Sequence, residues 1–149
     1  VVPGGRISNA LAACPYFHLP DDLVALPERA FVDCTSLTKL TLPAALATIG
    51  DSAFEGCTSL TQLALPATLT TIGSGVFGGC TSLTKLTLPA ALTTISECAF
   101  HGCTSLTELT LPAALATISD SAFEGCTSLS NASREAIATI VLCPHLQQL

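Results

Sequence analysis

The sequence predicts a β-rich solenoid of the α/β class, in which 23-residue coils of chain stack on one another. The first observation behind this prediction is a repeat: the stretch from Cys34 to Gly56 recurs without insertions, in copies that begin at Cys57, Cys80, Cys103 and, incompletely, Cys126. The second is how little the copies differ, because those beginning at Cys34 and Cys103 are identical except at two positions. A fixed period of roughly 20 to 50 residues is typical of folds whose units bury their apolar sides against each other.

Each unit is predicted to contain a short strand, a second extended run and a corner. In the copy that begins at Cys34, Leu40-Thr41-Leu42 alternates with period two, which indicates a strand with both leucines on one face. Pro43 ends this strand because proline cannot donate to a ladder. The run 46–49 turns a second apolar pair inward, and Ala53-Phe54 indicates a corner with a short helical turn. Stacking then buries columns of like side chains: the thiols Cys34, Cys57, Cys80, Cys103 and Cys126, and the rings Phe54, Phe77, Phe100 and Phe123.

The chain is expected to form one domain whose two ends differ from its middle. Residues 1–13 are predicted to cap the first coil, with Ser8 at the start of a short helix, and residues 14–33 to form a degenerate first repeat. Residues 34–125 are four near-identical repeats, and residues 126–149 are a divergent last repeat with a helical cap.

In the last part, Ser133 is predicted to N-cap a helix over residues 134–142 that turns Ile137, Ile140 and Val141 inward. The tail from Cys143 repeats the opening spacing of a unit. The chain therefore either ends in a cap, which we favour, or continues as a longer solenoid.

The repeat pattern C-x-x-L-x-x-L-x-L-P-x-x-L-x-x-I-x-x-x-A-F-x-x resembles the BspA-type leucine-rich repeat of bacterial and protist surface proteins, over about residues 34–129. The resemblance implies a right-handed leucine-rich-repeat solenoid with short parallel strands on one face. It also implies a role in binding or adhesion, with a protein or glycan partner, at the cell surface or after secretion. The many unpaired cysteines leave an intracellular or organellar location open.

Composition limits the classes of partner. The net charge of −6 and the pI of about 4.7 argue against nucleic acid or an anionic lipid surface as the partner. No apolar run is long enough to span a membrane. The chain contains no Met and Val1 follows no signal-like segment, so we expect a trimmed or mature fragment whose targeting signal cannot be read.

The cysteines and histidines are the candidates for chemistry. The thiol column is predicted to be reduced and buried, although the spacing between coils would also allow disulfides. Cys98 is predicted to be exposed, whereas Cys14 and Cys143 take core-like positions. The sequence Cys98-Ala-Phe-His101-Gly-Cys103 contains three residues of the types that bind zinc within six positions. The repeat, however, places the Cys103 side chain in the core and points those of Cys98 and His101 elsewhere. His18, His101 and His145 lie in three different units, so we expect neither a cofactor, nor a metal, nor an enzyme.

The outward side of the predicted strands is the candidate binding surface. Two lanes run across it, and the first varies at nearly every unit while the surrounding sequence is almost copied. The first lane reads Tyr16, Lys39, Gln62, Lys85, Glu108 and Asn131, and the second reads His18, Thr41, Ala64, Thr87, Thr110 and Ser133. Variation on a constant scaffold is expected of a recognition surface, and equally of unconstrained drift.

Other interpretations remain open at this point. The chain could be a structural subunit or spacer in a larger assembly, or a designed consensus scaffold. Two threonine columns are typical of ice-binding proteins, although threonine also favours strands on its own account. Asn131-Ala132-Ser133 spells a glycosylation acceptor. The corner acids are interpreted as solvating groups and not as calcium ligands: Asp51, Glu55, Glu97, Asp120 and Glu124. The threonine columns are Thr48, Thr71, Thr94 and Thr117, and Thr38, Thr61, Thr84 and Thr107.

Overall fold

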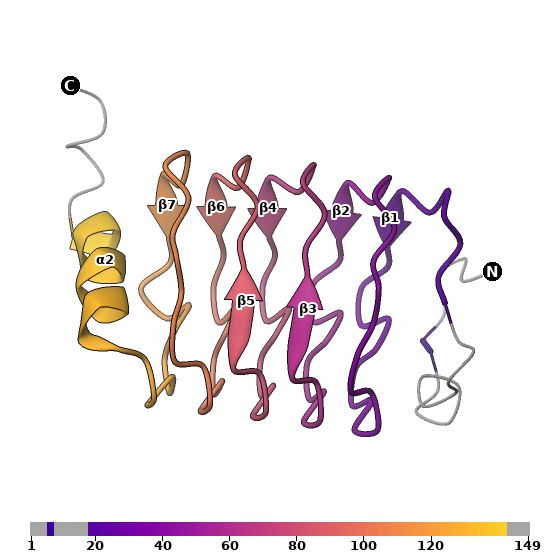
Figure 1. The fold of residues 1–149 in the computed structure, drawn as a ribbon, viewed down its shortest axis with the longest axis horizontal. Helices are drawn as coiled ribbons and strands as arrows, with labels where there is room; N and C mark the ends of the chain where they lie inside the picture. The colour runs from indigo at the N-terminus through magenta and orange to yellow at the C-terminus, as the bar shows by residue number, and fades with distance from the viewer. Residues whose placement is uncertain (1–5, 8–17, 143–149) are drawn as a thin grey trace.

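The computed structural model describes residues 6–7 and 18–142 and shows a row of stacked coils. Figure 1 shows the coils side by side along the long axis of the molecule, in the order of the sequence. The predicted leucine-rich-repeat solenoid is therefore confirmed. The expected helix around Ser8, together with Tyr16, Cys14 and Cys143, lies outside the described residues.

Short parallel strands line two faces of the stack (Figure 1). On one face β3 (Gln62–Ala64) pairs with β5 (Lys85–Thr87). On the other face β1 (Ala25–Leu26) pairs with β2 (Thr48–Ile49), and β4 (Thr71–Ile72), β6 (Thr94–Ile95) and β7 (Thr117–Ile118) form a three-stranded sheet. The short parallel strands expected on one face are present, and the Thr-Ile runs also pair from coil to coil on the other face.

The first strand of each unit begins earlier than the leucine pair suggested. Leu40-Thr41-Leu42 forms only one bridge, from Thr41 to Ala64, and in the next unit the ladder covers Gln62–Ala64. Backbone hydrogen bonds already join Thr61 to Thr38 before the strand starts, and the chain leaves the ladder as it approaches the proline. Both leucines nevertheless turn inward, since Leu42 is buried and Leu40 is partly buried and packs against the core.

The core consists of columns of like side chains. The rings of Phe31, Phe54, Phe77, Phe100 and Phe123 stack nearly parallel, with successive centroids 5.2, 5.7, 5.3 and 5.0 Å apart. Each column thiol donates to a backbone carbonyl of the preceding coil: Cys57 to Phe31 at 3.1 Å, Cys80 to Phe54 at 3.2 Å and Cys103 to Phe77 at 3.1 Å. The predicted burial of both columns is confirmed, except that Phe123, next to the C-terminal end, is partly exposed.

The corners are held by backbone geometry and by one acid. Ser52, Gly75 and Cys98 occupy equivalent positions with φ of 54°, 62° and 54°, a conformation that costs least at glycine. The carboxylate of Asp51 accepts a hydrogen bond from the Ser74 N–H at 2.9 Å and lies over Gly73, where a side chain would clash with it. Asp51 is exposed, as expected of a solvating group, and it also joins one corner to the next.

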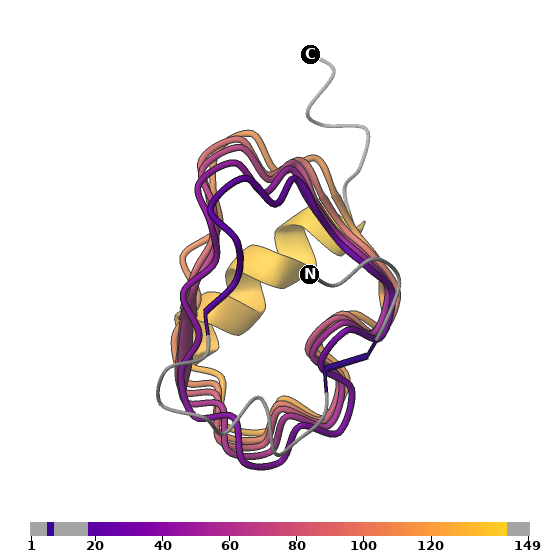
Figure 2. The same cartoon turned by 90° about the vertical axis from the view of Figure 1, so that its right-hand side faces the viewer.

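The helix α2 (Asn131–Leu142) lies across the end of the stack (Figure 2). Ser130, not Ser133, caps its N-terminus: the Ser130 hydroxyl accepts from the Ser133 N–H at 3.2 Å. The helix begins three residues earlier than predicted because Ser130 still pairs with Thr107 of the preceding coil before the chain turns. Ile137, Ile140 and Val141 pack against the core as predicted.

Ser133 and Arg134 form hydrogen bonds to backbone groups near the end of the stack. The buried Ser133 hydroxyl accepts from the Leu109 N–H at 3.2 Å. Arg134 donates to the carbonyls of Cys126, Thr127 and Leu129. Ser133 thus gives the Leu109 N–H a partner at this edge of the ladder, and Arg134 ties the first turn of α2 to the segment before it.

Replacing Ser133 with alanine should lower the free energy of unfolding by about 1–3 kcal/mol, because the Leu109 N–H would stay buried without a partner. Chemical denaturation would measure the change. Ser128→Ala is the matched control, since Ser128 is exposed in the same repeat, and it should have almost no effect. Equal losses in the two variants would contradict the capping role.

Candidate functional site

The candidate site is the outward side of β3 and β5 with the adjoining residues of the neighbouring coils, here called the lysine face. Its first lane contains Lys39, Gln62, Lys85 and Glu108, all exposed, with Gln62 in register with Lys85 and Lys85 bridged to Glu108. Its second lane contains Thr41, Ala64, Thr87 and Thr110, also exposed, with Ala64 bonded between Thr41 and Thr87. The strands hold the two lanes parallel, because alternate residues of a strand point to the same side.

The structure limits the ends of these predicted lanes. Tyr16 lies outside the described residues, whereas His18 is exposed. At the other end, Asn131 begins α2 and Ser133 is buried, so neither belongs to the face. Including them as lane positions was wrong, because the 23-residue register continues into a segment that has become helical.

Two shallow grooves lie between the lanes. The first has a volume of about 360 Å³ and is bounded by Lys39, Gln62 and Lys85 on one side and by Thr41, Ala64 and Thr87 on the other. The second has a volume of about 370 Å³ and is bounded by Lys85, Thr87, Glu108 and Thr110, together with Ala90 and Pro112. Lys85 and Thr87 belong to both grooves, so they form the wall between them.

The metal-like trio does not converge. Cys98 is half-buried, with its Sγ 3.9 Å from the Ser121 Oγ, and it is thus less exposed than predicted. His101 is exposed, and its Nδ1 lies 3.9 Å from the Glu124 Oε2. The thiol of Cys103 points into the core and donates to Phe77. Within residues 6–7 and 18–142 no group of three potential ligands is placed to hold a metal ion.

Four of the five column thiols hold their protons more firmly than a free thiol, whereas the hydrogen bond with Cys103 lowers the pKa of Cys126. Burial raises the pKa of Cys80 from an ordinary value of 9.0 to about 12. Burial likewise raises the pKa of Cys34 and, more strongly, that of Cys57. Since the thiolate is the reactive form, these side chains act as apolar filling and not as nucleophiles or metal ligands.

One of the two threonine columns has a structural use. The hydroxyls of Thr61, Thr84 and Thr107 each donate to the carbonyl of the threonine one coil earlier, at 3.4–3.5 Å. The other column lies in the sheets of the opposite face, where Thr71 pairs with Thr94 and Thr94 with Thr117. This use of the hydroxyls supports the strand-stabilising interpretation over ice binding.

Comparison with known proteins agrees with this architecture. A model of the BspA type leucine-rich repeat region matches residues 9–139 in six copies. A leucine-rich cell surface protein of Faecalibacterium prausnitzii has a similar structure, with a TM-score of 0.74 and 30% identity over 81% of this chain and 34% of its own. For a leucine-rich repeat protein of Bacteroides ovatus, the TM-score is 0.70 and the identity 35%, over 72% of this chain and 28% of that one.

The pneumococcal vaccine antigen PcpA is also similar, with a TM-score of 0.67 and 25% identity over 76% of this chain and 28% of its own. The chain thus spans about a third or less of the length of these three proteins. No curated protein matches the sequence. None of the described helices is long and apolar enough to cross a membrane.

Proposed function

We propose that this chain, which belongs to the BspA-type leucine-rich repeat family, is a non-catalytic recognition module that binds a protein or glycan partner through its lysine face. One observation carries the proposal. The first-lane residues Lys39, Gln62, Lys85 and Glu108 change from each repeat to the next, and they border the two grooves of this face. A constant scaffold with variable groove residues is how repeat proteins build extended binding surfaces.

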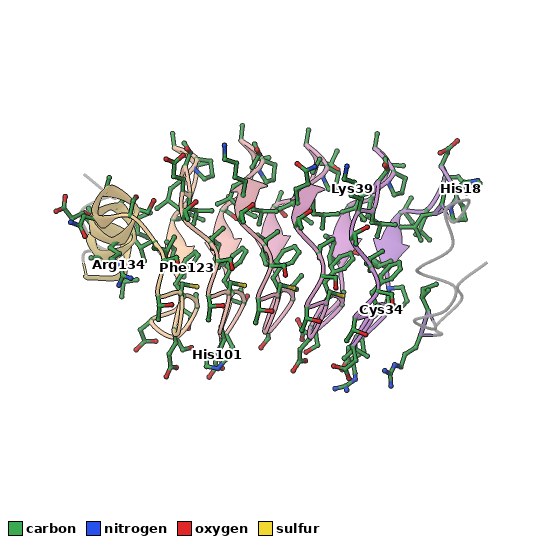
Figure 3. The ribbon with its side chains drawn as sticks, turned by 60° about the horizontal axis from the view of Figure 1, so that its bottom comes forward. His18, Cys34, Lys39, His101, Phe123 and Arg134 are labelled. Atoms are coloured by element: carbon green, nitrogen blue, oxygen red, sulfur yellow. The ribbon has the colours of Figure 1, made fainter. Side chains whose placement is uncertain are left out.

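The chemistry of the remaining side chains supports a role without catalysis. An enzyme needs a nucleophile or base of suitable pKa in a cleft that converges on a substrate. In the described part of the chain the column thiols are buried, burial raises the pKa of Cys57 and Cys80, and His101 lies on the opposite side of the stack from Lys39 (Figure 3). The lysine face instead offers hydrogen-bonding groups and charge along an open surface, which suits binding.

The similar structures support a role at a surface. One is a cell surface protein and another is a vaccine antigen, so adhesion to a host or to another cell is the function that best fits this chain. A structural subunit or spacer within a larger assembly is the second candidate, and the low share of charged residues, 11%, favours it. A spacer needs no binding face of its own.

A charge-matched pair of variants distinguishes the two. Lys85→Gln and Thr71→Glu each lower the net charge by one, the first on the lysine face and the second on the opposite face. Both positions are exposed, so we expect each free energy of unfolding to change by less than about 0.5 kcal/mol.

Binding of the two variants to an array of extracellular proteins and glycans would then be compared with binding of the unchanged chain. If the lysine face is the recognition surface, Lys85→Gln weakens the interactions that the unchanged chain makes, and Thr71→Glu leaves them intact. Loss in Thr71→Glu alone would place recognition on the opposite face. An unchanged chain that binds nothing would favour the spacer. A large loss of melting temperature in Lys85→Gln would show that the outward assignment of this lane is wrong.

A further inference from the structure

Positive charge is concentrated on the lysine face of an otherwise acidic molecule. The chain carries a net charge of −6, yet both of its lysines, Lys39 and Lys85, stand in the same lane. The arginines lie elsewhere: Arg6 and Arg134 donate to backbone carbonyls near the two ends of the stack, and Arg29 occupies a corner. Of the eleven acidic residues, only Glu108 stands in this lane.

Neither lysine is neutralised by a neighbour in the described part of the chain. The ion pair found there joins His101 to Glu124, on the opposite side of the stack from Lys39. Lys85 is bridged to Glu108 through the backbone, but the two side chains do not come within ion-pair distance. Two exposed ammonium groups are thus available on one side of a groove.

The two lysines are separated by two coils, with Gln62 between them. Adjacent strands lie about 4.8 Å apart, so the lysines are about 9.6 Å apart along the solenoid axis. Across the groove Ala64 takes the place that Thr41 and Thr87 take in the flanking coils, which leaves the middle of the groove open. The lanes are two residues apart on each parallel strand, or about 6.6 Å, and this distance sets the width of the groove.

We propose that this groove binds an acidic polypeptide segment in the polyproline II conformation, lying along the solenoid axis with carboxylates at positions i and i+3 on Lys39 and Lys85. The inference rests on the proposed function and specifies the partner. A polyproline II helix has three residues per turn and rises about 3.1 Å per residue, so carboxylates at i and i+3 face the same way about 9.3 Å apart. This distance of about 9.3 Å between carboxylates agrees with the distance of about 9.6 Å between Lys39 and Lys85.

Other peptide conformations fit less well. Residues i and i+2 of an extended strand lie only about 6.8 Å apart on one side, and i and i+4 about 13.6 Å. In an α-helix, which rises about 1.5 Å per residue, the residues on one face nearest to this spacing are i and i+7, about 10.5 Å apart. The backbone of polyproline II makes no internal hydrogen bonds, so its peptide groups need partners. The Gln62 carboxamide, midway between the lysines, can both donate to and accept from such a group.

A glycan is the weaker fit to this groove. Flat sugar rings are commonly held against aromatic side chains, and the described residues that border the two grooves include none. The phenylalanine rings from Phe31 to Phe100 are fully buried instead. An acidic polysaccharide is accordingly the alternative that the experiment must separate from a peptide.

The experiment tests whether binding depends on the spacing between the carboxylates of the peptide and between the two lysines of the groove. The probe is a fluorescent peptide of five Pro-Pro-Glu triplets, and its control has the same composition with glutamates rearranged so that no two are three residues apart. The variant Gln62→Lys combined with Lys85→Gln keeps the net charge but brings the two lysines to one coil apart. Binding would be measured by fluorescence polarisation at low ionic strength and again with added salt.

The unchanged chain should bind the triplet peptide more tightly than the rearranged one, and salt should weaken the binding. Lys85→Gln should lower the affinity roughly two- to fivefold, and the relocated pair should lose the preference for triplet spacing. No preference in the unchanged chain, or a preference that survives relocation, overturns the proposal. Binding of polygalacturonate without binding of the peptide also overturns the proposal. Self-association of the unchanged chain that Lys85→Gln abolishes overturns it as well. If the proposal fails while the array still shows loss in Lys85→Gln, the recognition surface stands and only the peptide is wrong.

Discussion

Replacing Phe77 with alanine should lower the free energy of unfolding by about 3–5 kcal/mol. The Phe77 ring is fully buried and stacks on a ring in the coil before it and on another in the coil after it. Its removal leaves a cavity in the middle of the column that the neighbouring coils cannot close without losing their hydrogen bonds to each other, such as that from Phe77 to Ala99. Denaturation by urea would measure the loss.

Phe123→Ala is the matched control within the same column. Its ring is partly exposed and stacks on Phe100, at the end of the column that β7 and α2 adjoin. We therefore expect a loss of only about 1–2 kcal/mol. A Phe77 variant no less stable than the Phe123 variant would show that the column is not the continuous core.

Raising the pH above 9 should destabilise the protein through its buried thiols. Burial raises the pKa of Cys80 from 9.0 to about 12 and that of Cys57 further still, so the folded chain keeps protons that the unfolded chain releases. The stabilisation is fully present below the unfolded pKa and is lost as the pH rises towards the folded values. At pH 10 the loss is about 1.4 kcal/mol per thiol, or about 3 kcal/mol for these two.

Denaturation curves recorded from pH 7 to pH 10.5 would reveal the effect as a stability that is constant below about pH 8 and falls above it. A variant with Cys57→Ala and Cys80→Ala should start less stable, because two core side chains are smaller, but should lose less on the alkaline side. Parallel pH dependences in the variant and the unchanged chain would contradict protonated thiols in the core.

Much of this fold could be predicted because one repeat specifies the others. Once Leu37, Cys57 or Phe54 is placed inward in one coil, the fixed spacing places its equivalents inward in every coil, and the structure confirms this burial for all of them except the partly exposed Phe123. The lanes of the lysine face follow from the same spacing together with the alternation of a strand. Both inferences require only that each coil places its residues as the preceding coil does, 23 residues earlier in the sequence.

The parts that could not be predicted depend on contacts between unlike coils. Asp51 reaches the backbone of Ser74 because Gly73 leaves room above it, and neither residue shows this within its own repeat. Ser133 was taken for a helix cap because the sequence does not reveal that the Leu109 N–H needs a partner. At the C-terminal end the repeat sequence stops. The hydrogen bonds of the last coil therefore depend on the helix that takes the place of a further coil.

The candidate site, too, could be predicted only in part. The lane residues were found from their variation, but Ala90 and Pro112 in the wall of the second groove were not. They come from the segment after the strand, which the alternation of the strand does not describe. The signal that could have found them is the Leu-Pro-Ala sequence that closes each strand and lies beside the second lane.

Labelling of individual cysteines under native conditions tests the stacked core most directly. A thiol reagent with mass-spectrometric identification of each modified cysteine would follow Cys34, Cys57, Cys80, Cys98, Cys103 and Cys126 in one experiment. The arrangement predicts that half-buried Cys98 reacts first and that the five column thiols react only when the chain unfolds, because they lie in the core. Column thiols that react as fast as Cys98 would show that the coils do not enclose a shared interior.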